Sequence, residues 1–395
     1  MHNYRIALIL PCAVVIAACA TRSYKYQDAD FDSLRQRAEI QTEGPLRVSA
    51  AVLGSEETRA IFGLNLYSQG IQPVWLQIEN TGESLARYAP VSTDPDYFAP
   101  LEIAYKNRGG LSAEAREQVN QRFDQLAMRR YVYPGEVQSG FVFTHLDVGA
   151  KVFSVDVSTR NQYRSFMFAL RVPGFEADYS RVDLGSIYAD GDLHSYDTDH
   201  LQQALRDLPC CSTRGRQSTS GEPINLVLVG NNLELLIALL RSGWHETSVA
   251  DASALAAEFY FGRPQDAVFR YESPGGEGFF ELRFWLAPIK VGDQSVWVGQ
   301  ARHFFNWIGI VERFDADVDT ARMFAVQKFL YGQAIQSIAW LSGTAVVPAT
   351  SFWDQLVNTP YFTDGYRVVL WLSGEPSSVL DVQVLDWDSP PRMVP

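Results

Sequence analysis

Cysteine is scarce in this chain, with four residues among 395. No Cys-x-x-Cys pair or Cys/His array occurs, so the common zinc frames are excluded and we expect no metal site and no cofactor. Gly-x-Ser-x-Gly, His-Glu-x-x-His and Ser-x-x-Lys are also missing, which excludes the commonest hydrolase signatures. Apolar runs are short as well, and none approaches the ~20 residues of a membrane-spanning helix.

The chain also has fewer basic than acidic residues. The chain has 33 basic and 46 acidic residues, and its formal net charge is −13. Nucleic acid and anionic lipid headgroups repel so acidic a body, so we expect neither as a direct partner. The remaining composition, 47% hydrophobic and 20% charged, is that of an ordinary globular protein rather than a disordered one.

The first residues have the pattern of a secretory signal peptide. Arg5 precedes the apolar stretch 6–16, and Ala17-Ala18-Cys19 follows it. This segment resembles the leader of bacterial lipoproteins, a resemblance that implies cleavage after residue 18 and a lipid on the sulfur and amine of Cys19. An uncleaved anchor and an ordinary signal peptide are the alternatives. The run is short for a span, Pro11 interrupts it, and an ordinary signal peptide needs no cysteine at this place.

The predicted lipid determines the expected location. A chain attached through Cys19 is a membrane-anchored protein of the cell envelope, with the membrane as its first partner. Ala20 follows the cysteine, where an acidic residue would indicate retention at the inner membrane. We therefore favour the outer membrane, with the body facing the periplasm.

The pattern after the leader predicts a tether and then a β-rich domain. Residues 19–44 are polar and mixed in charge, so we expect a tether with a short helix near 31–40. Apolar and polar residues then alternate in several short segments of residues 45–178, which is typical of an antiparallel, immunoglobulin-like β-sandwich. A helix capped by Ser112 and running to Ala127 interrupts these strands.

The second half predicts a linker and an α+β domain. Residues 179–222 are hydrophilic and are expected to form the linker. Residues 223–395 begin with a buried strand over 224–229 and a helix over 233–241, and a later helix is expected over 320–338. The predicted fold class is therefore mixed, an N-terminal antiparallel β-sandwich followed by a C-terminal α+β domain.

Cys210 and Cys211 are the only cysteines outside the leader and the anchor, and they are adjacent. In an oxidising compartment they form a vicinal disulfide, remain as two buried thiols, or bridge to another molecule. A bond between neighbours is more reducible than a structural staple, so we consider a structural linker or a redox-sensitive one.

Several motifs in the second half resemble the LssY-like C-terminal domain family of bacterial proteins. They cover roughly residues 205–345 and are, in order, Leu208-Pro-Cys-Cys211, Ile224–Gly230, Gly243-Trp244, Phe261–Asp266, Arg283-Phe-Trp, Val296–Arg302 and Asp315–Arg322. Members of that family often accompany membrane proteins of the phosphatidic-acid-phosphatase or DedA type, and the resemblance implies an envelope context without an activity. This chain departs from the family at Glu312, where a histidine is expected.

Polar residues within these motifs form the candidate ligand-binding site. Its members are Arg263, Gln265, Asp266, Arg302 and His303, with the acids Asp315, Asp317 and Asp319 near them. Arginine side chains bind phosphate or carboxylate groups in bidentate fashion, and a histidine can serve as acid or base. The alternative is that 263–266 forms a hydrogen-bonded corner and that the acids cap a helix.

Taken together, the sequence favours a binding or scaffold component at the membrane surface with an envelope protein as partner, and no catalytic residue is assigned. The competing hypothesis is an envelope hydrolase that acts on phosphate or lipid groups at Arg263 and His303. A third hypothesis is redox sensing through Cys210 and Cys211.

Overall fold

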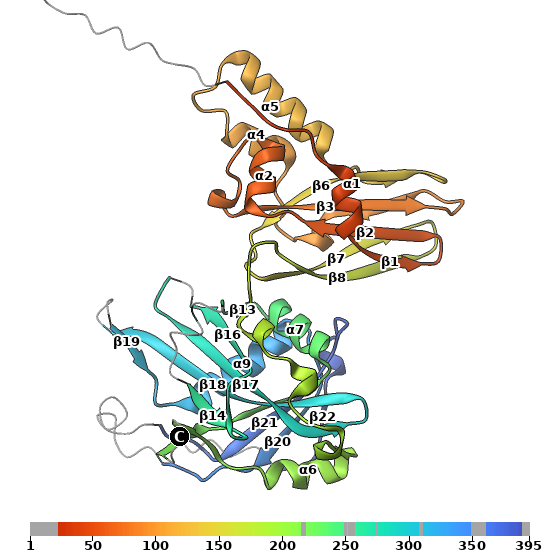
Figure 1. Cartoon of the computed structure of the whole chain (residues 1–395). Coiled ribbons are helices and arrows are strands. Elements are labelled where there is room, and N and C mark those ends of the chain that lie inside the picture. The colour runs from red at the N-terminus through yellow and green to blue at the C-terminus, as the bar shows by residue number, and fades with distance from the viewer. Residues whose placement is uncertain are drawn as a thin grey trace, which may run out of the picture.

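The computed structural model describes residues 23–214, 219–248, 251, 257–273, 275–307, 311–348 and 361–388. Within them the protein is a mixed α and β fold with mostly antiparallel sheets (Figure 1). The expected signal peptide and Cys19 lie outside the described residues. Among the helices that are described, none combines the length and apolarity needed to cross a membrane.

The first half contains two four-stranded antiparallel sheets. One has the order β1 (Glu39–Glu43), β2 (Leu46–Val52), β3 (Ile71–Asn80), β6 (Val137–His145). The other has the order β5 (Tyr131–Val132), β4 (Ala86–Ala89), β7 (Ala150–Ser158), β8 (Tyr163–Arg171). They share one buried cluster, to which Val48 and Leu76 contribute from the first sheet and Phe153 and Phe168 from the second. The expected strands of this half are confirmed.

The opposite face of the first sheet is covered by helices. They are α1 (Phe31–Arg37), α2 (Ser55–Phe62), α4 (Pro100–Lys106) and α5 (Ala113–Leu126), while α3 (Pro90–Thr93) lies against β7. Alternate residues of one strand point to opposite faces, so Trp75 of β3 packs under these helices while its neighbour Leu76 packs toward the second sheet. The expected helix after Ser112 is confirmed, and the Ser112 hydroxyl caps it by accepting from the Ala115 N–H at 3.1 Å.

The expected tether differs from the structure over residues 23–44. Leu34 of α1 is fully buried, Tyr24 is nearly so, and β1 pairs with β2 from Glu39 to Glu43. Strand β1 is an edge strand whose side chains are mostly exposed, so it lacks the alternating pattern that would have identified it. The folded body therefore starts well before residue 45.

The second half is built on the largest sheet of the described residues. Its order is β13 (His245–Glu246), β16 (Ala267–Glu272), β17 (Gly278–Val291), β18 (Gln294–Trp307), β12 (Leu226–Gly230), β21 (Tyr366–Leu372), β20 (Ile335–Ser342), β22 (Gln383–Val384). Strand β19 (Val311–Phe314) pairs with β18, and β9 (His194–Tyr196) pairs with β17. A smaller sheet has the order β11 (Thr219–Pro223), β10 (Cys211–Arg214), β14 (Glu258–Tyr260), β15 (Arg263–Pro264).

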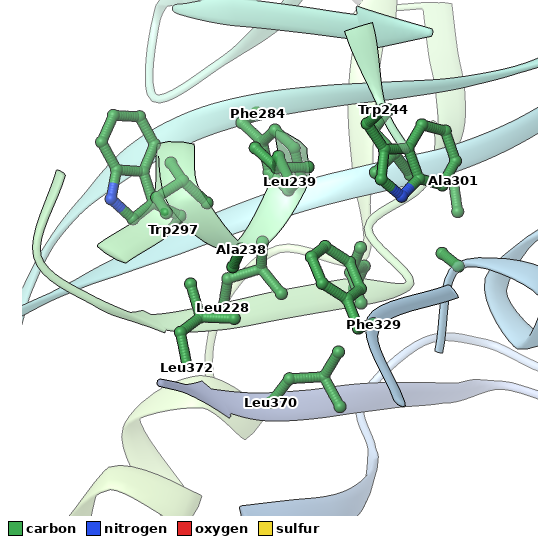
Figure 2. Close-up of a cluster of buried hydrophobic side chains, with 14 of the residues drawn as sticks. Leu228, Ala238, Leu239, Trp244, Phe284, Trp297, Ala301, Phe329, Leu370 and Leu372 are labelled. Atoms are coloured by element: carbon green, nitrogen blue, oxygen red, sulfur yellow. The ribbon is translucent and has the colours of Figure 1, made fainter. Parts of the chain in front are cut away.

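Helices cover both faces of the largest sheet. α7 (Asn232–Arg241) and α9 (Val318–Tyr331) pack on one face, where Leu239 and Phe329 meet Phe284 and Trp297 of the sheet (Figure 2). α6 (Thr198–Arg206) packs on the other face. The helix expected over 320–338 ends at Tyr331, because the chain turns through Gly332 and Gln333 and then enters β20.

The expected linker over 179–222 also differs from the structure. It contains the short 3-10 helices η2 (Asp178–Arg181), η3 (Leu184–Ser186) and η4 (Asp190–Asp192), followed by β9, α6, β10 and β11. Leu201 and Leu205 of α6 are fully buried, because residues four apart lie on one helix face and that face packs on the largest sheet. Most of this hydrophilic segment thus belongs to the folded body.

Candidate functional site

Arg263 and Asp266 form a hydrogen-bonded corner. The Arg263 Nε and Nη2 donate to the two carboxylate oxygens of Asp266 at 3.0 and 2.8 Å, and Nη1 donates to the Tyr188 hydroxyl at 2.8 Å. Asp266 is buried and also accepts from the Leu286 N–H at 2.7 Å. Gln265 accepts from the Glu258 N–H at 3.2 Å. These contacts agree with the alternative interpretation, a hydrogen-bonded corner over 263–266, because the Arg263 guanidinium binds Asp266 and Tyr188.

Arg302 belongs to a buried ion cluster. It contacts Glu281 (Nη1 to Oε1, 3.1 Å) and both carboxylate oxygens of Glu222 at 2.8 and 3.0 Å. Arg283 and Arg270 approach the Glu281 carboxylate as well, at 2.8 and 3.1 Å. Glu222, Glu281 and Arg283 are each at most 3% exposed. Two buried carboxylates therefore face several guanidinium groups, and the charges compensate one another.

The two carboxylates of this cluster have opposite pKa shifts. Burial raises the pKa of Glu222, and the nearby Glu258 carboxylate adds to this, while Arg302 only partly offsets them. Burial also disfavours the charge on Glu281, but Arg283 and Arg302 outweigh it and hold the pKa of Glu281 below its usual range. Glu281 is therefore the anion on which the cluster depends.

His303 lies on the opposite face of β18 from Arg302, because neighbouring residues of a strand point to opposite sides. Its ring stacks on Phe280 with centroids 4.2 Å apart, and its Nδ1 lies 2.9 Å from the Asp315 carboxylate. Asp317 caps α9 by accepting from the N–H groups of Asp319 and Thr320. The structure thus brings His303 to Asp315, whereas Arg302 and the Arg263 corner make separate sets of contacts.

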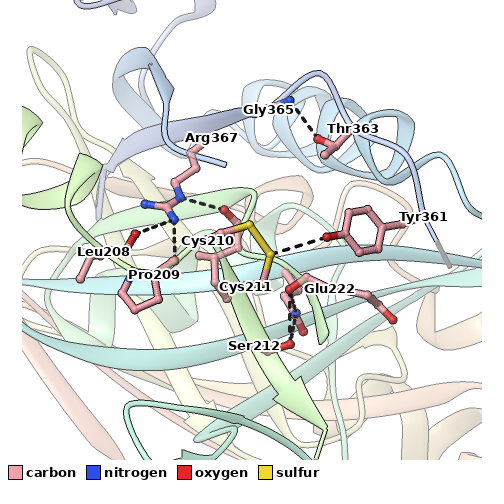
Figure 3. Close-up of a disulfide and its surroundings, with 12 residues drawn as sticks. Leu208, Pro209, Cys210, Cys211, Ser212, Glu222, Tyr361, Thr363, Gly365 and Arg367 are labelled. Atoms are coloured by element: carbon pink, nitrogen blue, oxygen red, sulfur yellow. Dashed lines mark hydrogen bonds between the residues drawn. A yellow bond between two sulfur atoms is a disulfide. The ribbon is translucent and has the colours of Figure 1, made fainter. Parts of the chain in front are cut away.

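Cys210 and Cys211 form a disulfide at the start of β10 (Figure 3). Both residues are half-buried, and the Cys211 sulfur lies 3.6 Å from the Tyr361 hydroxyl. Buried Arg367 fixes the preceding segment by donating to the backbone carbonyls of Leu208 and Pro209 at 3.3 and 2.7 Å. A redox role for this bond stays a prediction. In the part of the chain that the structure describes, no group of three His, Cys, Asp or Glu residues could hold a metal ion.

A feature that the sequence did not predict is a hollow of about 640 Å³ in the first half. We call it the aromatic groove and define it by eight of its lining residues: Tyr97, Phe98, Leu101, Met128, Tyr131, Tyr133, Phe141 and Phe143. Tyr131 and Tyr133 are more than half exposed. Arg130 also lines the groove and donates to the Tyr97 hydroxyl at 3.0 Å.

The aromatic groove follows the outer edge of β6, which is the last strand of its sheet. Phe98 and Met128 each donate one backbone N–H to this edge, to the carbonyls of Phe143 and Phe141 at 2.8 and 3.0 Å. A Cβ on Gly140 would lie 2.6 Å from the Met128 nitrogen, so only glycine allows this close approach. At residues 137–139, which precede Gly140 in β6, no described strand pairs with the outer edge of β6. The alternating Tyr131-Val-Tyr133 was the signal available in the sequence.

No family model matches the chain, and no curated protein matches it. The site must therefore be interpreted from its own geometry.

Proposed function

We propose that this chain is a cell-envelope lipoprotein that binds a partner protein at the membrane surface, and that the aromatic groove is the binding site. In this proposal Cys19 carries the lipid, an immunoglobulin-like β-sandwich supplies the groove, and the second half is an LssY-like α+β domain. The observation that carries the proposal is the aromatic groove beside residues 137–139 of β6, where no described strand pairs with the outer edge.

The chemistry of the groove suits an extended segment of another protein. Its volume lies within the ~300–1,000 Å³ of ordinary binding pockets, and aromatic side chains are the usual anchors of protein interfaces. The backbone of residues 137–139 offers hydrogen-bonding groups to an added strand, and Tyr131 and Tyr133 offer exposed rings beside it. Backbone pairing would supply affinity, and the aromatic pockets would select apolar side chains.

The position of the first described residues bears on where a lipid on Cys19 would hold the body. Tyr24 is buried and its hydroxyl donates to the Phe62 carbonyl at 2.6 Å. Four residue steps separate Cys19 from Ser23, which at full extension span about 14 Å. A lipid on Cys19 would therefore hold the α2 and α5 end of the body near the bilayer.

The alternative of an envelope hydrolase at Arg263 and His303 has no comparable support among the described residues. Arg263 is paired with Asp266, and Arg302 is paired with Glu222 and Glu281. His303 lies on the other face of β18 from Arg302. A phosphate would have to displace buried ion pairs to reach either guanidinium.

Photocrosslinking in intact cells tests the proposed binding site. With p-benzoylphenylalanine at Tyr133, we expect one discrete protein adduct, and the same probe at Tyr163, which is 66% exposed on β8, is the matched control. The adducted protein is then purified and titrated. Tyr133→Ala should weaken its binding at least about tenfold, while Tyr163→Ala should not. Equal adducts at both positions, or equal affinities of both variants, would contradict the proposal.

A further inference from the structure

A second hollow, of about 460 Å³, lies at the start of α7. We call it the Trp297 pocket. Phe269 and Trp297 of the largest sheet form its floor, Leu236 of α7 and Leu184 of η3 form its walls, and Arg171 lies on its rim. It shares no lining residue with the aromatic groove. Its apolar floor and walls suit an alkyl or aryl group.

Trp297 lines this pocket, and its indole nitrogen is buried. The side chain is only 2% exposed, and its N–H finds no acceptor among the described residues. Figure 2 shows this nitrogen directed away from the other labelled side chains of the core. By contrast, the indole N–H of Trp285 donates to the Arg263 carbonyl at 3.3 Å. A buried donor without an acceptor is costly, so a ligand that supplies an acceptor at Trp297 gains affinity.

The first turn of α7 adds donors to the same pocket. Asn232 and Leu233 line it, and the N–H groups at the start of a helix have no partner within the helix. The capping box of Asn231 and Glu234 satisfies each residue's N–H with the other's side chain. Asp183 turns its carboxylate to the Gly185 N–H at 3.2 Å. The first turn of α7, at the positive end of the helix dipole, and Arg171 both contribute lining residues, and Asp183, which also lines the pocket, has the Gly185 N–H as a partner. This lining favours an anionic acceptor.

From this geometry we infer that the Trp297 pocket binds a small carboxylic acid with an alkyl or aryl body. The carboxylate accepts from the Trp297 indole N–H and from the first N–H groups of α7. The apolar body packs against Phe269, Leu236 and Leu184. This inference does not depend on the aromatic groove or on the lipid anchor.

Indole NMR of the full folded chain tests the inference. The protein is labelled with ¹⁵N at its tryptophan indoles, and the Trp297 signal is assigned by its absence in Trp297→Phe. Phenylacetate and octanoate are titrated as probes, with phenethylamine as the cationic counterpart of phenylacetate. We expect saturable movement of the Trp297 signal with both acids and none with the amine. The indoles of Trp75 and Trp244, which also lack an acceptor among the described residues but line other parts of the core, should stay in place.

Two variants separate binding in the pocket from a general effect on the fold. Leu184→Trp fills the pocket from its partly exposed wall and should weaken phenylacetate binding at least about tenfold, whereas Leu380→Trp, at a site that is 94% exposed, should not. Trp297→Phe should remove the preference for phenylacetate over benzyl alcohol. A Trp297 signal that no acid moves overturns the inference, and so does binding that survives Leu184→Trp.

Discussion

At the scale of single residues, Glu281 is a buried carboxylate in contact with the guanidinium groups of three arginines. It is 1% exposed and contacts Arg270, Arg283 and Arg302. Removing one partner of a buried ion cluster leaves the others uncompensated, so we expect Glu281→Gln to lower the free energy of unfolding by about 3 kcal/mol. Chemical denaturation at pH 7 measures this loss.

The matched control is Glu102→Gln on α4. Glu102 pairs with Lys106 at 2.5 Å, but both side chains are about half exposed, so its loss should cost less than about 1 kcal/mol. Equal effects of the two substitutions would show that burial does not set the strength of the Glu281 cluster.

Asp178 gives the protein a stability term that depends on pH. Burial and the neighbouring Glu246 carboxylate raise the pKa of Asp178 to about 7, although the N–H groups of Tyr179 and Val268 hydrogen-bond to it. A raised carboxyl pKa means that the folded state holds the proton more tightly than the unfolded state. The protonated Asp178 carboxyl therefore adds to the free energy of unfolding near pH 4, and this contribution is lost as the pH rises through 7.

Asp178→Asn keeps a side-chain acceptor and removes the titration. Each pKa unit corresponds to about 1.4 kcal/mol, and a half-buried site relaxes, so we expect wild type to lose on the order of 2 kcal/mol relative to Asp178→Asn between pH 4.5 and 8. Denaturation curves across this range measure the difference. A constant difference at every pH would mean that Asp178 does not titrate there.

At the scale of elements, Gly63 joins the first segment of the body to α2. It ends α2 with φ of 62°, and a Cβ there would lie 2.2 Å from the Lys25 carbonyl oxygen. We expect Gly63→Ala to destabilise the protein by about 2 kcal/mol and to increase hydrogen exchange over residues 23–30, because the chain must move away.

Gly70→Ala is the control for this effect. Gly70 has a similar φ of 71°, but nothing lies within 4 Å of its Cβ position. Gly70→Ala should therefore be destabilised only by the backbone strain of a positive φ, and hydrogen exchange at residues 23–30 should not change. Comparable exchange in both variants would rule out the contact with Lys25 as the cause.

The elements that the sequence predicted well are those with a complete local signal. Ser112 and the apolar stripe of α5 predicted that helix, and the apolar run over 224–229 predicted a buried strand, which the structure has as β12. Strand β1 was missed because an edge strand buries little, and α6 was placed in a linker because most of its residues are polar. The candidate site was only partly predictable for a related reason. The Arg263–Asp266 corner is local, but Glu222 lies 80 positions from Arg302, and no local pattern links them.

At the scale of the whole molecule, the proposed lipid on Cys19 would decide where the body is held. If it carries the lipid, Cys19→Ser should move the protein from the membrane fraction to the soluble fraction of the envelope, because no acyl chain then anchors it. Fractionation with immunoblotting measures this, and the mass of the N-terminal peptide reports the modification. Cys12→Ser removes a cysteine from the proposed leader and should leave the distribution unchanged. Membrane retention of the Cys19 variant would contradict the lipoprotein proposal.

The order of strands in the largest sheet also constrains how the chain can fold. Strand β12 lies between β18 and β21, and Arg367 at the start of β21 bonds the carbonyl of Ile224, 143 positions earlier. A chain made from its N-terminus can complete the sheets of residues 39–171 early, while β12 waits with an open edge until residue 372 has emerged. Such distant pairing slows folding and prolongs exposure of an apolar edge. We therefore expect the pairing of β21 with β12 to be a late step in the folding of the whole protein.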